Sequence, residues 1–335
     1  MGTSSRRADT RRGTAMRPHV RRVARRLADL MTVLGFRAAW ALVRLLPERW
    51  AYGLFGFAAD RAYAAGDAGI AQLRANLQRI RPDLTGEDLE ATVREGVRRY
   101  LRYYCAAFRL PALTRERVLE SVVARNDAAV RAELAAGRPV VCFLGHIGNW
   151  DLAGAWCVHA LGPVITVAER LQPEEVFVEF LRFRESLGMR IFALGDGDVF
   201  DRLGAVLHGP VVMPLLSDRD LTSTGVTVDL RGHPARVAAG PAALAVDHDA
   251  ALFPVSMREW PRPDGGYGIE VTFHDRVYPP EIGTARERIH AATQACVDSL
   301  GEAMAAHPEE WHMMQAVFVE DLDPQRLARA GGATP

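Results

Sequence analysis

Short apolar runs alternate with helical segments through the second half of the chain, and this alternation restricts the fold more than any other feature. The run Val140–Leu144 is wholly apolar and contains β-branched residues, which is typical of a strand buried on both faces. A helical stretch follows from Asn149. Further strands are predicted at 164–167, 189–193, 211–216, 225–230, 250–257 and 267–273, and further helices at 173–187, 199–207, 239–247 and 286–306. This order predicts an α/β fold with a mostly parallel central sheet flanked by helices on both faces.

The first part of the chain is mainly helical. Residues 27–65 are rich in Leu, Ala, Trp and Phe, but no run reaches the about 18 to 20 apolar residues that a membrane span requires. The pattern predicts N-terminal amphipathic helices instead, one up to Leu46 and another from Arg49. We therefore expect one domain over 27–325, mainly helical over 27–137 and α/β over 138–325.

The two ends of the chain have the composition of disordered segments. Residues 1–26 contain nine arginines and a single acid, Asp9, with almost no apolar content, and residues 326–335 are predicted to be a disordered tail. A basic arm beside an amphipathic helix is typical of a protein that lies on an anionic membrane surface. These features predict peripheral attachment to the cytoplasmic face of the cell membrane, although such helices can also simply cover a core.

Composition excludes some functions. The chain has 41 basic and 41 acidic residues, so its formal net charge is zero and predicts no nucleic-acid partner. Every basic residue is arginine, because the sequence contains no lysine. The four cysteines lie far apart without Cys-x-x-Cys spacing, which indicates buried thiols in a reducing compartment rather than a metal site.

An imidazole and a carboxylate lie where the first strand of the α/β region turns into its helix. His146 and Asp151 are four residues apart in this turn, and open α/β sheets bind ligands at such turns. An acid that faces a histidine can fix its tautomer and make it a base. The spacing alone is common by chance, and Asn149 and Asp151 also suit the start of any helix. The word Gly-His-Ile-Gly-Asn-Trp-Asp adds weight, because its two glycines allow a tight turn beside the imidazole.

Charged residues follow three other predicted elements. They are Asp218, Arg219 and Asp220 after the strand 211–216, Glu169 and Arg170 after the strand 164–167, and Arg184 near the end of the helix 173–187. The first group stands at the end of a buried strand, where charges are costly without partners, and this favours a functional site. Taken alone, Glu169 and Arg170 indicate an ion pair, and Arg184 indicates a solvated arginine.

Six sequence words occur together in one order. They are GHIGNWDLAG from Gly145, TVAERLQPE from Thr166, FRESLGM from Phe183, SDRDL from Ser217, AAGPAALA from Ala238 and HPEEWHMMQ from His307. The first resembles the HX4D motif of the lysophospholipid acyltransferase superfamily. Together the words resemble the actinobacterial phosphatidylinositol mannoside acyltransferases, which are similar to the late acyltransferases of lipid A. The resemblance covers roughly 27–322 and implies a glycerolipid acyltransferase-like α/β fold. One position departs, since the family commonly has Glu where this chain has Asp218.

The resemblance implies a membrane-associated acyltransferase that moves a palmitoyl-type chain from acyl-CoA to a mannose hydroxyl of phosphatidylinositol mannoside. Acyl-CoA would be a co-substrate, with no other cofactor and no metal. His146 would be the general base, Asp151 would orient the imidazole and stabilise the imidazolium, and Asp218 would be a second carboxylate partner. The start of the helix after Gly148 would disfavour the charged imidazole and so lower its pKa.

Five side chains are predicted to bind substrate: Glu169, Arg170, Arg184, Arg219 and Asp220. Among these, the three arginines would bind the phosphate of an acidic lipid, because a guanidinium matches phosphate oxygens in bidentate fashion.

Three other functions fit parts of the pattern. A late lipid A-type acyltransferase would take acyl carrier protein as its donor. A metal-dependent glycosyltransferase would use Asp218 and Asp220 as a DxD metal site. A non-catalytic protein that binds the membrane surface would need only the basic arm and the amphipathic helices.

Overall fold

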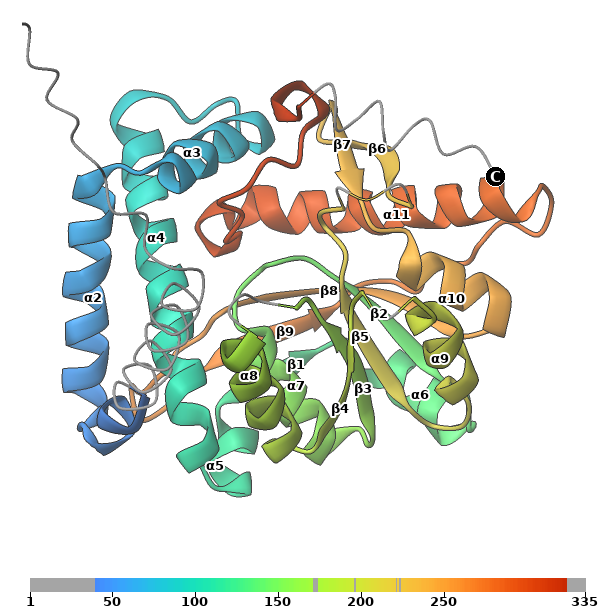
Figure 1. Ribbon diagram of the computed structural model, residues 1–335, viewed down its shortest axis with the longest axis horizontal. Helices are drawn as coiled ribbons and strands as arrows, with labels where there is room; N and C mark the ends of the chain where they lie inside the picture. Colours follow the sequence, from blue (N-terminus) through green and yellow to red (C-terminus); the bar gives the residue numbers. More distant parts are fainter. Residues whose placement is uncertain (1–39, 171–173, 196, 221, 223, 324–335) are drawn as a thin grey trace, which may run out of the picture.

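A seven-stranded sheet forms the centre of the computed structural model (Figure 1), which describes residues 40–170, 174–195, 197–220, 222 and 224–323. The strands are β1 (Val122–Arg125), β2 (Val140–Leu144), β3 (Val164–Ala168), β4 (Met189–Ala193), β5 (Val212–Leu216), β8 (Ala251–Glu259) and β9 (Ile269–Phe273). Their order across the sheet is β1-β9-β8-β2-β5-β3-β4. The predicted basic arm at 1–26 and tail at 326–335 lie outside the described residues.

The sheet is mostly parallel, as predicted. β2 pairs in parallel with β5 and β8, and β3 pairs in parallel with β4 and β5. Only β8 and β9 are antiparallel, so β9 and its parallel neighbour β1 run against the other strands. The last residue of β2, Leu144, pairs with Leu216 of β5 and with Val255 of β8. The segments that follow β2 and β5 therefore leave the sheet at the same edge.

Helices cover both faces of the sheet (Figure 1). The α-helices are α2 (Glu48–Ala65), α3 (Ala68–Ile80), α4 (Gly86–Arg109), α5 (Arg115–Glu120), α6 (Ala128–Ala135), α7 (Trp150–Ala160), α8 (Glu174–Ser186), α9 (Val199–Val206), α10 (Gly240–His248) and α11 (Ala285–Ala306). Short 3-10 turns are η1 (Leu110–Ala112), η2 (Pro308–Glu310) and η3 (Val319–Asp321). This arrangement confirms the predicted fold class.

β2 shows how the sheet separates two cores. Its side chains alternate, so Val141 and Phe143 pack with α10 and α11, whereas Val140, Cys142 and Leu144 pack with α6 and α7. All five residues of β2 are buried. The uninterrupted apolar run is therefore explained by apolar neighbours on both faces.

Two strands were missing from the sequence-based prediction. β1 joins the sheet beside β9, so the α/β part begins at β1 and not near Arg138. β7 (His233–Val237) pairs with β6 (Val226–Leu230) in a separate antiparallel hairpin. β1 has only four residues and its last is exposed, while β7 contains a proline, so neither has the pattern of a buried strand.

The N-terminal helices of the described part pack on α4. Residues 40–45 are helical, Pro47 precedes α2, and α2 lies along α4 (Figure 1). This agrees with the predicted break between two helices. In the portion of the chain that can be described, no helix has both the length and the apolar character needed to cross a membrane.

The four cysteines are buried and unpaired. Burial raises the pKa of each thiol, most strongly that of Cys142 in β2. The prediction that the thiols are buried is confirmed.

Candidate active site

The centre of the site is a hydrogen-bonded pair formed by residues that follow β2 and β5. The Nδ1 atom of His146 lies 2.7 Å from one oxygen of Asp218, and the His146 backbone N–H donates to the other oxygen at 2.9 Å. Both residues stand at the carboxyl edge of the sheet because β2 and β5 are adjacent and parallel. The aspartate therefore reaches the imidazole although its side chain is one methylene shorter than the glutamate typical of the family. The two residues were predicted at this site, and the structure brings them into contact.

The contact defines the chemistry of the imidazole. Since Nδ1–H donates to a carboxylate, the lone pair of the neutral ring is on Nε2, which is then the basic atom. Burial lowers the pKa of His146, but the Asp218 carboxylate raises it, and the net pKa lies above the ordinary histidine value. The prediction that the helix start would lower this pKa is wrong, because the neighbouring carboxylate acts more strongly. His146 is one-third exposed at its side chain, so it can meet a substrate.

Asp218 is buried and receives a third hydrogen bond. Trp311 donates its indole Nε1–H to Asp218 at 2.8 Å, and both residues are at most 3% exposed. Burial raises the pKa of Asp218, whereas His146 and the donors around the carboxylate lower it, with a net decrease. The acid thus stays ionised beside the imidazole. Trp311 was given no role in the sequence-based prediction, although it stands in the HPEEWHMMQ word.

The segment after η2 also holds the main chain of the His146 turn. The N–H of His312 donates to the carbonyl of His146 at 2.8 Å, and Ile147 forms an antiparallel bridge with Trp311. Gly148 adopts a φ of 63°, and a side chain there would meet Met257 of β8 at 2.8 Å. The turn is therefore fixed from two sides, which explains why its second glycine is required.

Asp151 does not contact His146. Its carboxylate accepts from Arg184 Nε at 2.6 Å and from the Tyr103 hydroxyl at 2.8 Å, and the residue is only 1% exposed. The prediction that Asp151 orients the imidazole is corrected, because Asp151 lies in the first turn of α7 and points toward α4 and α8. Arg184 is likewise an ion-pair partner that is 18% exposed at its side chain, and not a solvated arginine. Burial lowers the pKa of Arg184, but Asp151 raises it, and the net pKa of the guanidinium lies above its ordinary value.

Aromatic rings connect the His146–Asp218 pair with the group formed by Asp151, Tyr103 and Arg184. The ring of Trp150 lies 5.5 Å from that of His146 and 4.2 Å from that of Tyr103. Within the described residues, the Nε1 atom of Trp150 and the Nδ1 atom of His312 are buried without a hydrogen-bond partner. Burial and the nearby His146 lower the pKa of His312 to about 3, so this imidazole is neutral. The sequence-based prediction assigns no role in the site to Trp150 or His312.

The other predicted substrate-binding residues are spread around the centre. Arg219 lies 3.6 Å from Glu169. Arg219 lowers the pKa of His146, whereas Glu169 raises it. Arg170 pairs with Glu174 in the first turn of α8. Asp220 accepts from the backbone N–H of Thr222 at 2.7 Å. The contacts of Arg170 and Asp220 are local. Arg219 and Glu169 are the predicted substrate-binding residues whose charges affect the pKa of His146.

A metal-based site is not supported by the donor set. Both oxygens of Asp218 are used by His146 and Trp311, and Asp220 turns to Thr222. Among the described residues, no three His, Cys, Asp or Glu side chains come together in a way that could hold a metal ion. The arrangement suits proton transfer at Nε2 of His146.

Comparison with known proteins identifies the family of the chain. The model of a family described as bacterial lipid A biosynthesis acyltransferase matches residues 19–319. A phosphatidylinositol mannoside acyltransferase of Mycolicibacterium smegmatis is 40% identical over 307 residues, which cover 91% of this chain and 97% of that protein. A protein of the same name from Mycobacterium tuberculosis is 38% identical over 299 residues, which cover 88% of this chain and 90% of that protein. The chain therefore belongs to the bacterial lipid A biosynthesis acyltransferase family and, within it, resembles the phosphatidylinositol mannoside acyltransferases.

Proposed function

We propose that this acyltransferase moves a palmitoyl-type chain from acyl-CoA to a mannose hydroxyl of phosphatidylinositol mannoside, with His146 as the general base. The pair of His146 and Asp218 carries the proposal, because it makes Nε2 the basic atom of a partly exposed imidazole beside a buried carboxylate. The names of the relatives support the acceptor.

The reaction needs only proton transfer by the protein. Nε2 of His146 removes the proton of the hydroxyl while the oxygen attacks the thioester carbonyl. The carbon–sulfur bond then breaks, and the imidazolium returns the proton to the leaving thiolate. Asp218 stabilises the imidazolium between these two steps, which is consistent with its lowered pKa. No covalent acyl-enzyme is required.

Phosphate groups of the donor or acceptor need cationic partners. Arg219 is proposed for this role because its pairing with Glu169 is long, at 3.6 Å, and because it follows Asp218 in the chain. Arg184 is engaged with the buried Asp151, so we propose that it holds this part of the site in place and does not contact phosphate.

We further propose that the protein attaches peripherally to the anionic cytoplasmic face of the cell membrane. α2 carries Trp50, Leu54 and Phe57 at helical spacing, and these side chains are 64%, 51% and 66% exposed. Beside the start of α2, a cavity of about 510 Å³ is lined by both signs of charge, with Arg49, Arg102, Arg117 and Arg262 beside Glu48, Glu259 and Asp264. The exposed apolar side chains of α2 support the proposal, because such a face suits the boundary between acyl chains and headgroups.

Binding to lipid can be tested separately from catalysis. Wild type should float with vesicles that contain anionic phospholipid, and a variant with Trp50→Ser and Phe57→Ser should remain in the soluble fraction at moderate salt. Equal flotation of both proteins would contradict the role of this face.

The reaction is tested with purified protein, palmitoyl-CoA and phosphatidylinositol mannoside. Thiol release and the mass of the lipid product are followed for wild type, His146→Ala and the control His208→Ala, an exposed histidine between α9 and β5. We expect acceptor-dependent release with one added acyl chain, lost in His146→Ala and kept in the control. Palmitoyl-loaded acyl carrier protein in place of palmitoyl-CoA tests the other donor, and activity only with that donor would overturn the assignment of CoA. Insensitivity to EDTA is expected, whereas loss and metal-dependent recovery would favour glycosyl transfer.

A further inference from the structure

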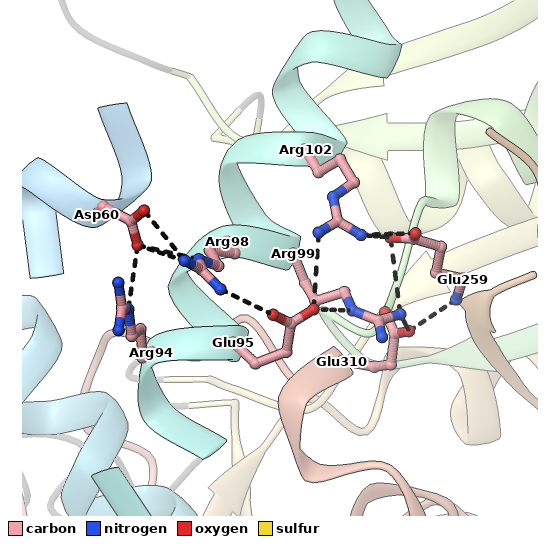
Figure 2. A network of polar contacts seen from close by, with 8 residues as sticks. All are labelled: Asp60, Arg94, Glu95, Arg98, Arg99, Arg102, Glu259 and Glu310. Carbon is pink, nitrogen blue, oxygen red and sulfur yellow. Dashed lines mark hydrogen bonds and ion pairs between the residues drawn. The ribbon is translucent and has the colours of Figure 1, made fainter. Parts of the chain in front are cut away.

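A network of eight charged side chains runs from α2 through α4 to the segment beside the active site (Figure 2). It contains four arginines and four acids, so its charges balance: Asp60, Arg94, Glu95, Arg98, Arg99, Arg102, Glu259 and Glu310. Its outer end is half-exposed, since Asp60 binds Arg94 and Arg98 between α2 and α4. Its inner end is Glu310, the last residue of η2.

Glu310 is the buried member of the network. Its side chain is 3% exposed, and one of its oxygens accepts from Arg99 at 2.6 Å and from the backbone N–H of Glu259 at 2.7 Å. Burial raises the pKa of Glu310 to about 7, while Arg99 and the Glu259 amide oppose the increase and the carboxylates of Glu259 and Glu309 add to it. A carboxyl group in this position is costly unless its partners are fixed, so these contacts define where η2 can lie.

The main chain of the same residue reaches the active-site turn. The carbonyl of Glu310 accepts from the N–H of Gly148 at 2.9 Å. The next two residues are Trp311, which donates to Asp218, and His312, which donates to the carbonyl of His146. Glu310 therefore joins the charged network through its side chain and the catalytic turn through its backbone.

β8 completes this connection. Glu259 ends β8 and donates its N–H to Glu310, and Met257, two residues earlier, lies so close to Gly148 that a Cβ there would be 2.8 Å from it. Arg102 holds the Glu259 carboxylate at 2.6 Å and 2.7 Å. The end of β8, η2 and the turn after β2 are thus tied to one another at Glu310, although they are far apart in the sequence.

We propose that Glu310 is a positioning residue for the His146–Asp218 pair. It fixes the segment 310–312, whose backbone binds the turn that carries His146 and whose Trp311 indole donates to Asp218. The inference rests on the proposed function, in which this pair supplies the base. It does not make Glu310 a catalytic residue, because its carboxylate faces Arg99 and β8 and not the imidazole.

The test compares two buried carboxylates with the same kind of partners. Glu133 is 9% exposed, pairs with Arg138 and Arg276, and lies in α6 before β2, at the opposite edge of the sheet. We expect Glu310→Ala to lower kcat on the order of 100-fold with little change in KM, because small displacements of a catalytic base have effects of this size. Glu133→Ala should lower the melting temperature and leave kcat unchanged. Glu310→Gln should recover most of the activity, because its amide oxygen can still accept from the Glu259 N–H.

A second measurement does not depend on acyl transfer. The pKa of His146 is obtained from the pH dependence of its modification by diethyl pyrocarbonate, followed on the peptide that contains it. We expect Glu310→Ala to lower this pKa by about one unit, since Asp218 would no longer be held against the ring. Glu310→Gln should keep most of the wild-type value, although it removes the same charge. An equal decrease in both variants would mean that only the charge of Glu310 acts, and would overturn the proposal.

The remaining outcomes also separate the hypotheses. A Glu310→Ala protein with wild-type kcat and an unchanged His146 pKa would show that the network is only structural. If wild type transfers no acyl chain, the proposed function fails, while the pKa comparison still decides the positioning role. If Glu310→Ala does not fold, Glu310→Asp replaces it, because the shorter side chain withdraws the carboxylate from Arg99 and Glu259 without removing the charge.

Discussion

Replacing Asp218 by asparagine should change which nitrogen of His146 carries the proton. Asp218 accepts three hydrogen bonds, one oxygen from Nδ1 of His146 and the other from the His146 backbone and the Trp311 indole. In an Asp218→Asn variant, we expect the amide oxygen to accept from the His146 backbone N–H and the Trp311 indole. The reverse orientation would place the amide NH2 group against these two N–H donors. The NH2 group then faces Nδ1 and donates to it, so the ring proton moves to Nε2.

The expected loss of activity follows from this tautomer. An imidazole protonated at Nε2 cannot accept the proton of a hydroxyl, and the carboxylate that stabilises the imidazolium is also gone. Loss of these two effects predicts a decrease in kcat of about 10³- to 10⁴-fold, or about 4 to 5.5 kcal/mol in the activation free energy. The protein itself should remain folded, because two of the three hydrogen bonds are kept and the third is reversed in direction.

The assay is acceptor-dependent acyl transfer between pH 5 and pH 9. Wild-type activity should rise with pH through the increased pKa of His146, since the base must be neutral. The residual activity of Asp218→Asn should show this rise at lower pH, because the carboxylate that raises the pKa is absent. Asp229→Asn is the control, since Asp229 is an exposed carboxylate that accepts from Gly232 in the β6–β7 turn. A variant that retained kcat within tenfold of wild type would refute the tautomer argument.

Three further changes test other parts of the structure. Arg184→Met leaves the Asp151 carboxylate buried without its cation, so the free energy of unfolding should fall by about 3 to 5 kcal/mol. Asp151→Asn in the same chain should restore part of this loss. An unchanged melting temperature in Arg184→Met would contradict the stabilising role of the pair. Gly148→Ala would force an alanine into a positive φ and place its methyl group 2.8 Å from Met257. We therefore expect a lower melting temperature and a lower rate of acyl transfer. His312 has a pKa of about 3 when folded and an ordinary value when unfolded, so its contribution to stability is present above about pH 6.5 and is lost as the pH falls toward 3. Between pH 6.5 and pH 5 this loss amounts to about 2 kcal/mol, and urea unfolding of His312→Gln should show a correspondingly smaller decrease than wild type.

The sequence predicted the sheet well where strands are buried on both faces. The apolar run at 140–144 is the strand β2, and the residue expected to cap the next helix, Asn149, accepts from the N–H of Leu152. β1 could not be recognised because it is a short strand at the edge of the sheet, with partial burial and no flanking apolar run.

The site was predicted less completely, for a geometric reason. Spacing along the chain suggested that Asp151 faces His146, but the helix turns this side chain toward Tyr103 and Arg184. The acid that does face the imidazole comes from a parallel neighbouring strand, and pairing between strands is not encoded in local spacing. Trp311 stands 93 residues beyond Asp218, so only its place in a recognised sequence word could have indicated it.

The burial of the cysteines affects how the protein reacts with its donor if that donor is a thioester, as proposed. Thioesters pass their acyl group readily to thiolates and to amines. Here burial keeps all four thiols protonated and out of reach, and a sequence without lysine offers no side-chain amine at all. Acylation of the protein at a thiol or at a lysine side chain is therefore not expected while it holds an activated acyl chain next to the base.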